Sequence, residues 1–179
     1  MESRIVRTSL LVGVLLAGCS EATTTAPRVD ATAADVPGPI VRSATGSGHF
    51  ESGGELRTFT FAAAGRADGS ATGEYHITIH AIDRYFHASV TCMRVRNDTA
   101  WVAGVIDSTN HPAIQVGTVT YFWAVDGGEG EGTTDVVSLA RINDAAGQDQ
   151  VFCDLTPDEQ FSGLPGRVVE NGNVQVRSQ

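Results

Sequence analysis

The sequence contains no lysine, only three cysteines, and no apolar run of the roughly 20 residues that a membrane-spanning helix needs. All 12 basic residues are arginines, they are scattered, and 21 acidic residues outnumber them, so the formal net charge is -9. Surfaces that follow nucleic-acid phosphates need clustered positive charge, so we expect no nucleic-acid partner. The length of 179 residues and the 41% hydrophobic content are those of one globular domain.

Motifs of common enzymes are also missing. The chain has no Gly-x-Ser-x-Gly elbow, no His-Glu-x-x-His pair, no phosphate loop and no dinucleotide fingerprint. No nucleophile and base stand in a known spacing, and we therefore predict that the protein is not an enzyme and needs no cofactor.

The first 18 residues are typical of an export signal. Arg4 and Arg7 precede an apolar run over residues 8–16, which is too short to span a bilayer. The ending Leu16-Ala17-Gly18-Cys19 resembles the lipobox of bacterial lipoproteins, and this resemblance implies acyl chains, such as palmitate, on Cys19. A plain signal peptide with an incidental cysteine is the alternative.

Residues 19–40 are expected to form a flexible tether after the lipidated cysteine. Ser20 follows Cys19 where an aspartate could stand, which resembles the outer-membrane sorting signature of Gram-negative lipoproteins. The stretch after it is rich in Ala, Thr, Asp and Pro and has no aromatic residue. As a coil it would reach about 25 Å from end to end. An edge strand is the alternative for this stretch.

Residues 41–179 are predicted to form one all-β domain. Short runs of β-branched and aromatic residues alternate with Gly, Asn and Asp, as in strands joined by tight turns. An open sheet would leave unpaired edges, so we expect a small barrel or barrel-like sandwich. About eight antiparallel strands are predicted, over residues 41–52, 55–65, 71–82, 85–95, 99–107, 116–126, 134–142 and 168–177.

Alternation of apolar and polar residues also predicts the pairing in two hairpins. A two-residue turn at Asp83-Arg84 would place Tyr75 opposite Cys92. A turn at Asn97-Asp98 would place Cys92 opposite Ala103. The first pairing implies that the side chain of Cys92 faces the barrel interior.

The late segment over residues 143–166 breaks the strand pattern. Thr156-Pro157-Asp158-Glu159 has the form of a helix-capping box, so a short helix is predicted to begin there and to end at Gly163. With Cys19 acylated, Cys92 and Cys153 remain as a pair in an oxidising compartment, which predicts one disulfide that fastens this segment to the barrel. Two buried free thiols are the alternative.

Several segments together resemble the post-COAP domain family of exported bacterial proteins. That family is all-β and carries no established reaction, so the resemblance implies a fold and a location outside the cytoplasm. It covers residues 42–177, although Gly127 stands where the family often has Asn. The segments are Gly46-Ser47-Gly48-His49, the 90–101 hairpin, Asp126-Gly127-Gly128-Glu129-Gly130 with Asp135, and Asn171-Gly172-Asn173-Val174-Gln175-Val176.

Three groups of residues could carry chemistry. Four carboxylates on a Gly-rich turn offer oxygen ligands to calcium as a possible cofactor, or form only a solvated turn: Asp126, Glu129, Glu131 and Asp135. Three histidines are placed by the predicted pairing on one outward face, where they could hold zinc or simply lie in solvent: His76, His80 and His87. Three aromatic residues could line a pocket for a small apolar ligand or fill the core: Tyr75, Phe86 and Trp101.

The sequence therefore predicts an envelope lipoprotein with a non-catalytic structural or binding β-domain. Its expected location is the outer membrane or the cell surface, held by the lipid and facing the periplasm or the exterior. A lipocalin-like carrier of a small hydrophobic molecule is the first alternative, and a metal-dependent hydrolase is the second.

Overall fold

A computed structural model describes residues 37–129, 132–143, 147–155 and 163–179. These residues form an antiparallel 10-stranded sheet, so the predicted all-β class is confirmed. The strand order is β10-β1-β2-β3-β4-β5-β6-β7-β9, and β8 also pairs with β6. The elements are β1 (Ile40–Ser52), β2 (Glu55–Arg66), β3 (Ala71–Ile79), the 3-10 turn η1 (His80–Ile82), β4 (Arg84–Arg96), β5 (Thr99–Thr109), β6 (Val119–Val125), β7 (Val136–Ser138), β8 (Arg141–Asn143), α1 (Gln148–Asp154), β9 (Gly166–Val168) and β10 (Glu170–Ser178).

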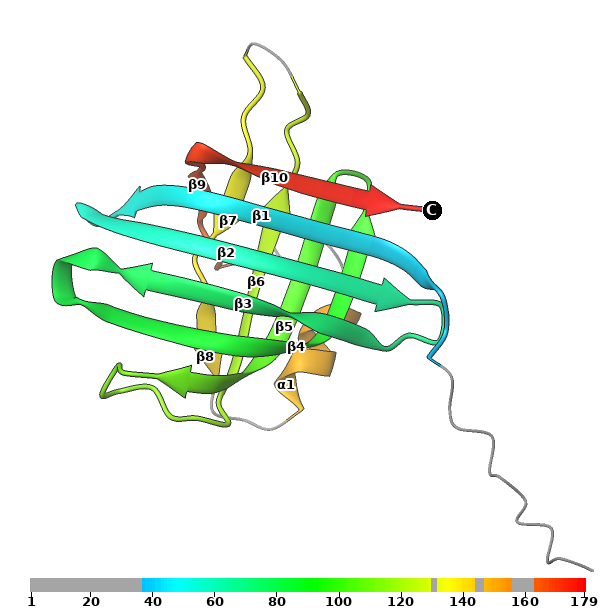
Figure 1. Ribbon diagram of the computed structural model, residues 1–179, viewed down its shortest axis with the longest axis horizontal. Helices are drawn as coiled ribbons and strands as arrows, with labels where there is room; N and C mark the ends of the chain where they lie inside the picture. The colour runs from blue at the N-terminus through cyan, green and yellow to red at the C-terminus, as the bar shows by residue number, and fades with distance from the viewer. Residues whose placement is uncertain (1–36, 130–131, 144–146, 156–162) are drawn as a thin grey trace, which may run out of the picture. The chain divides into compact units, whose positions relative to one another are not determined.

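The sheet folds back on itself into two layers. In Figure 1, β10, β1, β2 and β3 lie across the front, and β6 and β7 run steeply behind them. β4 and β5 turn from the front layer into the back layer, and their pairing register shifts at His87/Ala88 and at Val90/Cys92. Such bulges bend strands, which allows one sheet to form both layers of a barrel-like domain.

Aromatic side chains from both layers fill the space between them. The ring of Phe122 on β6 stacks on Tyr75 of β3 at a centroid distance of 4.3 Å and meets Phe61 of β2 edge-on at 5.2 Å. Phe86 meets Tyr75 at 5.5 Å, and all four side chains are at most 5% exposed. The main core therefore lies inside the barrel.

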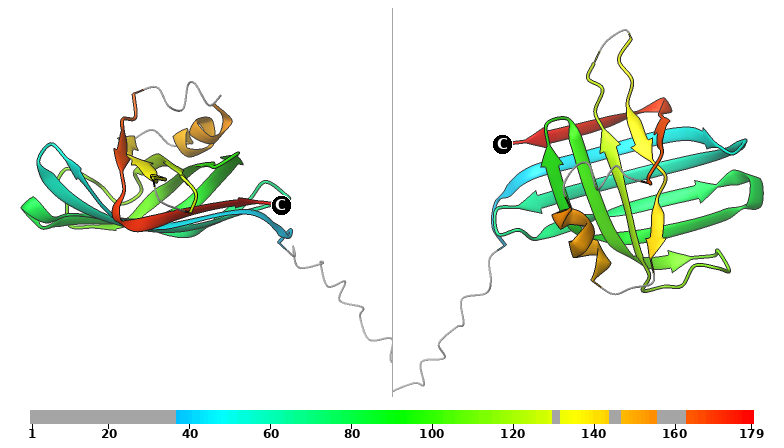
Figure 2. Two further views of the ribbon diagram at one scale, coloured as in Figure 1. Left: turned by 90° about the horizontal axis from the view of Figure 1, so that it is seen from above. Right: turned by 180° about the vertical axis from the view of Figure 1, so that it is seen from behind.

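A second cluster covers the outer side of the back layer. The helix α1 lies on that side (Figure 2, left). Phe152 of α1 stacks on Tyr121 of β6 at 4.4 Å, and Trp101, Trp123 and Leu164 are buried in the same cluster. The apolar residues on both sides of β6 are explained by these two cores. Within the described residues, no helix is long and apolar enough to cross a membrane.

The predicted Cys92–Cys153 disulfide is present and joins β4 to α1. The direction predicted for Cys92 was wrong, because its side chain lies in the outer cluster. The bulge at Thr91 inserts one extra residue between Val90 and Cys92, which reverses the alternation of side chains along β4. Gly104 faces this bulge, and a Cβ there would collide with the carbonyl oxygen of Ser89.

One of the two predicted hairpins is correct. Cys92 pairs with Ala103 across the turn at Asn97, which has the left-handed backbone such turns need (φ 53°). In the other hairpin Tyr75 pairs with Ala88 and not with Cys92. The turn is η1 followed by a left-handed Asp83, so it is centred two residues earlier than the predicted Asp83-Arg84 turn.

The late segment holds one helix that the sequence pattern did not predict. α1 begins after the left-handed Gly147 and has two buried residues, Phe152 and Cys153. The predicted capping box at residues 156–159 lies outside the described residues. The predicted strand over residues 134–142 is divided into β7 and β8, and a short strand, β9, precedes β10.

Candidate functional site

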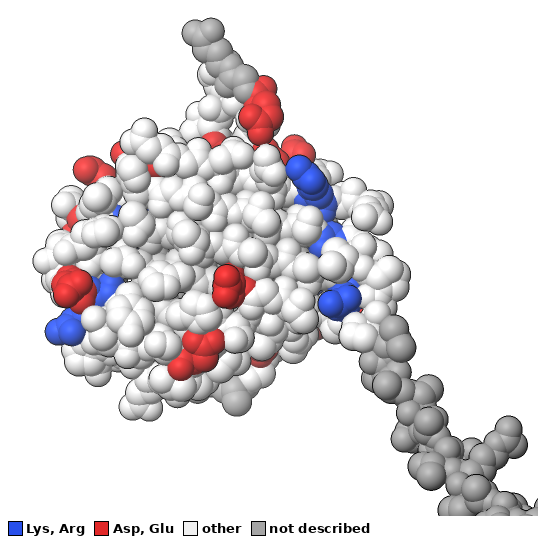
Figure 3. Space-filling view, viewed as in Figure 1, with Lys and Arg blue, Asp and Glu red and all other residues white. Residues whose placement is uncertain are grey.

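The outer side of the front layer carries a regular array of polar side chains, here called the polar face. Its three cross-strand rows on β1 to β4 are all exposed or half-buried, and they carry seven hydroxyls, three imidazoles and one carboxylate. The rows are Thr45, Ala62, Glu74 and Ser89; Ser47, Thr60, His76 and His87; and His49, Thr58, Thr78 and Tyr85. Figure 3 shows this side as a broad surface with few charged side chains.

One end of the polar face is organised around His87. The Nδ1 atom of His87 lies 2.6 Å from Oδ1 of Asp107, and the hydroxyl of Ser89 donates to Oδ2 of the same carboxylate at 2.7 Å. The other ring nitrogen, Nε2, lies 3.6 Å from Oε2 of Glu74. The imidazole of His87 is therefore held between two carboxylates from β3 and β5.

The neighbouring rings form a small platform. His76 lies directly across from His87, with ring centroids 6.2 Å apart. Tyr85 lies beside His76 with the two ring planes only 15° apart and the centroids 5.7 Å apart. The hydroxyl of Thr78 is 3.1 Å from Nε2 of His76. Flat rings and hydroxyls thus stand together on the exposed side of β3 and β4.

The predicted histidine trio is brought together only in part. His76 faces His87, whereas His80 lies in η1, where its Nε2 is 3.1 Å from the hydroxyl of Thr58. The prediction that His80 pairs with His87 was wrong, because the hairpin turn is centred two residues earlier than expected. In the part of the chain that the structure describes, no three His, Cys, Asp or Glu side chains are grouped so as to hold a metal ion.

The charges around His87 shift three pKa values in opposite directions. The hydrogen bond to Asp107 is the main cause that raises the pKa of His87, and Glu74 adds to it. Hydrogen bonds from His87 and Ser89 lower the pKa of Asp107. Burial, followed by the charge on His87, lowers the pKa of His76. Of the two facing imidazoles, His87 is therefore protonated first as the pH falls.

Replacing Asp107 with asparagine is expected to lower the pKa of His87 towards the ordinary value of about 6.5. Because the pKa of His87 is raised in the folded protein, its protonation stabilises the fold fully at a pH below about 6.5. This stabilisation is lost as the pH rises through the pKa that His87 has in the folded protein. A lowered Asp107 pKa stabilises the fold above about 3.9 and ceases to do so in stronger acid. The stabilities of the wild type and of Asp107→Asn should therefore differ most between about pH 3.9 and pH 6.5.

An NMR titration of the imidazole protons checks the Asp107→Asn prediction. Glu129→Gln, a carboxylate-to-amide change on a distant exposed turn, is the control and should leave both histidine titrations unchanged. An unaltered His87 midpoint in Asp107→Asn would show that the Asp107 contact does not hold the proton.

The geometry around His87 does not form a nucleophile–base pair. In a serine-type triad the hydroxyl contacts the imidazole nitrogen that lies opposite the acid. Here the hydroxyl of Ser89 donates to Asp107 itself, and Nε2 of His87 faces a carboxylate. This arrangement suits hydrogen bonding to a bound molecule better than activation of a nucleophile.

Two aspartates of the acidic turn that is predicted to bind calcium also have a structural role. Asp135 accepts hydrogen bonds from the backbone N–H groups of Gly127 and Val174, and Asp126 accepts from those of Gly128 and Val176. Val174 and Val176 belong to β10, so both aspartates fasten the β6–β7 side of the barrel to the other end of the sheet. Glu129 is exposed, Glu131 lies outside the described residues, and calcium binding at this turn stays a prediction.

Three of the segments that carry the predicted family resemblance meet where β10 contacts β1 and the acidic turn, a junction here called the seam. Ser47 pairs with Asn173, and Nε2 of His49 lies 3.1 Å from Nδ2 of Asn171. The aspartates of the acidic turn reach the same strand, β10, from its other edge. These contacts join β10 to β1 on one edge and to the acidic turn on the other, and so they close the barrel-like sheet.

Replacing Asp135 with alanine is expected to lower the free energy of unfolding by about 2 kcal/mol, because two backbone N–H groups lose their acceptor. Urea denaturation measures the loss, and amide exchange at Val174 should accelerate. Glu129→Ala on the same turn is the control, with an expected change within about 0.5 kcal/mol. Equal effects of the two substitutions would mean that Asp135 does not hold the seam.

The predicted ligand-lining residues do not share one space. Tyr75 and Phe86 lie in the barrel interior, whereas Trp101 belongs to the outer cluster beneath α1. Trp101 lies across from Arg94 after the Thr91 bulge, and so it faces away from the interior. The prediction that these three residues line a common pocket was therefore wrong.

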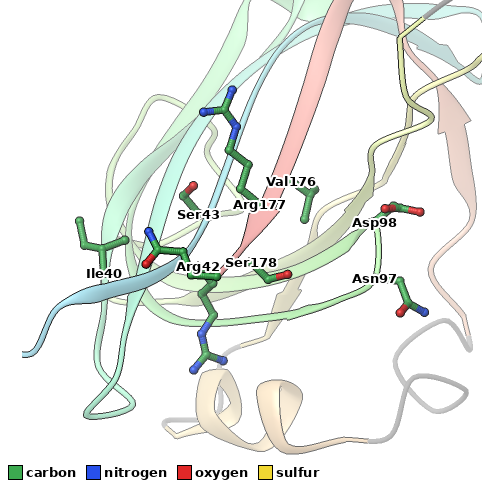
Figure 4. Close-up of a pocket in the computed structure, with 9 residues that line it drawn as sticks. Ile40, Arg42, Ser43, Asn97, Asp98, Val176, Arg177 and Ser178 are labelled. Atoms are coloured by element: carbon green, nitrogen blue, oxygen red, sulfur yellow. The ribbon is translucent and has the colours of Figure 1, made fainter.

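A hollow of about 640 Å³ opens at one end of the barrel. Two arginines line it, but Figure 4 shows that Arg42 and Arg177 point in opposite directions. Their guanidinium groups therefore do not converge on one anion. The lining residues are Ile40, Arg42, Ser43, Asn97, Asp98, Val176, Arg177, Ser178 and Gln179.

Comparisons with protein-family models, curated proteins and solved structures give no match to this chain. The resemblance to the post-COAP family therefore stays a prediction. The polar face, with His87 and its two carboxylates at one end, is the candidate functional site.

Proposed function

We propose that the protein is a lipid-anchored envelope lipoprotein whose β-domain binds a partner through its polar face and catalyses no reaction. The supporting observation is the packed interior, where the rings of Phe61, Tyr75 and Phe122 contact one another between the two layers. A domain filled in this way has to bind on its outside. The polar face is the broad surface on which hydrogen-bonding groups and exposed rings occur together.

The same observation disfavours the carrier function. The interior of a small barrel is either filled with side chains or holds one small ligand. Here Phe50, Phe59 and Phe122 are at most 2% exposed and lie in one continuous core. A hydrophobic ligand would have to displace these packed rings.

The anchor is proposed from the lipobox-like sequence at Cys19. Acyl chains on this cysteine would hold the domain at the outer membrane or the cell surface, facing the periplasm or the exterior. Lasting attachment needs more than one chain, because a single chain gives only reversible binding. The tether over residues 19–40 would then separate the folded domain from the headgroups.

Replacing Cys19 with alanine is expected to abolish incorporation of labelled palmitate and to move the protein from the membrane fraction to the soluble fraction. Labelling and fractionation of cells that express each variant measure both effects. Ser20→Ala is the neighbouring control and should keep the label. Wild-type protein that carries no label and stays soluble would disprove the anchor.

A further inference from the structure

We propose that the polar face binds a neutral polysaccharide, which gives the proposed binding function a ligand class and rests on that function. The polar face carries one carboxylate in a chain of net charge -9. Strand surfaces that only face water usually carry charged side chains, which also prevent aggregation. Away from the His87 end, the rows of the polar face carry no carboxylate and no arginine, which matches an uncharged partner.

The chemistry of the side chains selects a polyhydroxylated partner. The seven hydroxyls and the imidazoles of His49 and His76 can donate or accept hydrogen bonds, as sugar hydroxyls do. They stand in rows across adjacent strands, about 4.8 Å apart from strand to strand. A chain of sugar units presents hydroxyls in a comparable repeat, so many of them can bind at once. A protein partner would instead call for an apolar centre, and none of the twelve side chains is a large aliphatic one.

The end of the face around His87 adds the features that sugar rings need. Tyr85 and His76 present nearly parallel rings, on which the apolar side of a sugar ring can pack. Glu74 and Asp107 flank His87 and offer charged acceptors, which make stronger hydrogen bonds to hydroxyls than neutral acceptors do. The rows run across β1 to β4, so an extended chain that follows a row crosses four strands.

The test measures depletion of the full-length lipoprotein, kept in detergent micelles, by insoluble cellulose, chitin, β-1,3-glucan and mannan. We expect adsorption to at least one of them, weakened at least tenfold by Tyr85→Ala and largely retained by Tyr85→Phe, which keeps the ring. Thr60→Arg places a charge in the centre of the face and should abolish adsorption. Gln115→Arg adds the same charge on an exposed loop away from the face and should have no effect.

Thermal melts first establish that each variant is folded. The proposal is overturned if none of the four polysaccharides depletes the wild-type protein, or if Gln115→Arg weakens adsorption as much as Thr60→Arg does. Binding to alginate or dextran sulfate alone would also overturn it, because those polymers are charged. Any of these results leaves the Cys19 fractionation result untouched, so the ligand class and the membrane anchor can fail separately.

Discussion

Replacing Phe122 with alanine is expected to lower the free energy of unfolding by about 3–5 kcal/mol. Phe122 is 1% exposed and contacts Tyr75 and Phe61 across the interior. Removing its ring takes away these contacts and leaves a cavity in the centre of the core. Because a domain of this size is stable by only about 5–15 kcal/mol, the loss should be visible as a large shift in the urea midpoint.

The same variant tests whether the native interior is filled. An apolar cavity stays dry and can take up a small molecule such as benzene. Benzene should therefore raise the melting temperature of Phe122→Ala and leave that of the wild type unchanged. Val116→Ala, at a residue that is 63% exposed, is the control and should change stability by less than about 0.5 kcal/mol. Stabilisation of the wild type by benzene would indicate an open interior and revive the carrier function.

Removing the disulfide is expected to cost about 4 kcal/mol. Cys92 and Cys153 are separated by 61 positions, and in the chain-entropy model the closure of a loop of that length restricts the unfolded chain by this amount. We expect the loss in the double variant Cys92→Ala, Cys153→Ala, measured by urea denaturation. Both residues are 3% exposed, so alanine keeps the outer cluster apolar and adds only a small void.

The disulfide prediction has a local readout as well. Amide exchange should accelerate at Val151 in α1 and stay slow at Ile77 in the front layer, because the bond fastens α1 to β4. Reduction of the wild type under native conditions is the matched control and should reproduce the exchange pattern of the double variant. A double variant within about 1 kcal/mol of the wild type, with α1 still protected, would mean that packing of Phe152 alone holds this segment.

The fold was predictable from the sequence because each strand follows the period-two pattern over many residues. The run from Tyr75 to Thr78 alternates between buried and half-buried side chains, and the turn at Asn97 fixes the next hairpin. The turn at η1 was not predictable, because Asp83 can end a 3-10 turn as readily as it can begin a two-residue turn. Because the pairing is shifted by an even number of residues, the same side chains of β3 are buried as predicted, but each has a different partner on β4.

The site was harder to predict because it depends on two β-bulges that the alternation of apolar and polar residues does not indicate. The shift between His87 and Ala88 makes Asp107 an extra residue on β5 and brings its carboxylate to the imidazole. The bulge at Thr91 turns Cys92 and the strand after it outwards. Neither bulge carries a glycine or proline of its own, although Gly104 opposite the second one is a signal that a close backbone approach was needed.

The aspartates of the seam show a related difficulty. Asp126 and Asp135 were grouped with Glu129 and Glu131 because all four lie close together in the sequence. Asp135 and Asp126 also accept the backbone N–H groups of Val174 and Val176, which lie 39 and 50 positions further along the chain. Carboxylates that bind a cation and carboxylates that bind backbone amides share one local pattern, and only the tertiary fold separates them.

Intact-mass spectrometry of the protein extracted from its native membrane tests the lipid anchor, the disulfide and the filled interior in one experiment. Under denaturing conditions we predict a chain that begins at Cys19, carries acyl groups and lacks two hydrogen atoms for the Cys92–Cys153 bond. Under native conditions we predict no further small apolar molecule in the domain. A chain that retains residues 1–18 without acyl groups, or a hydrophobic ligand released on denaturation, would contradict the account.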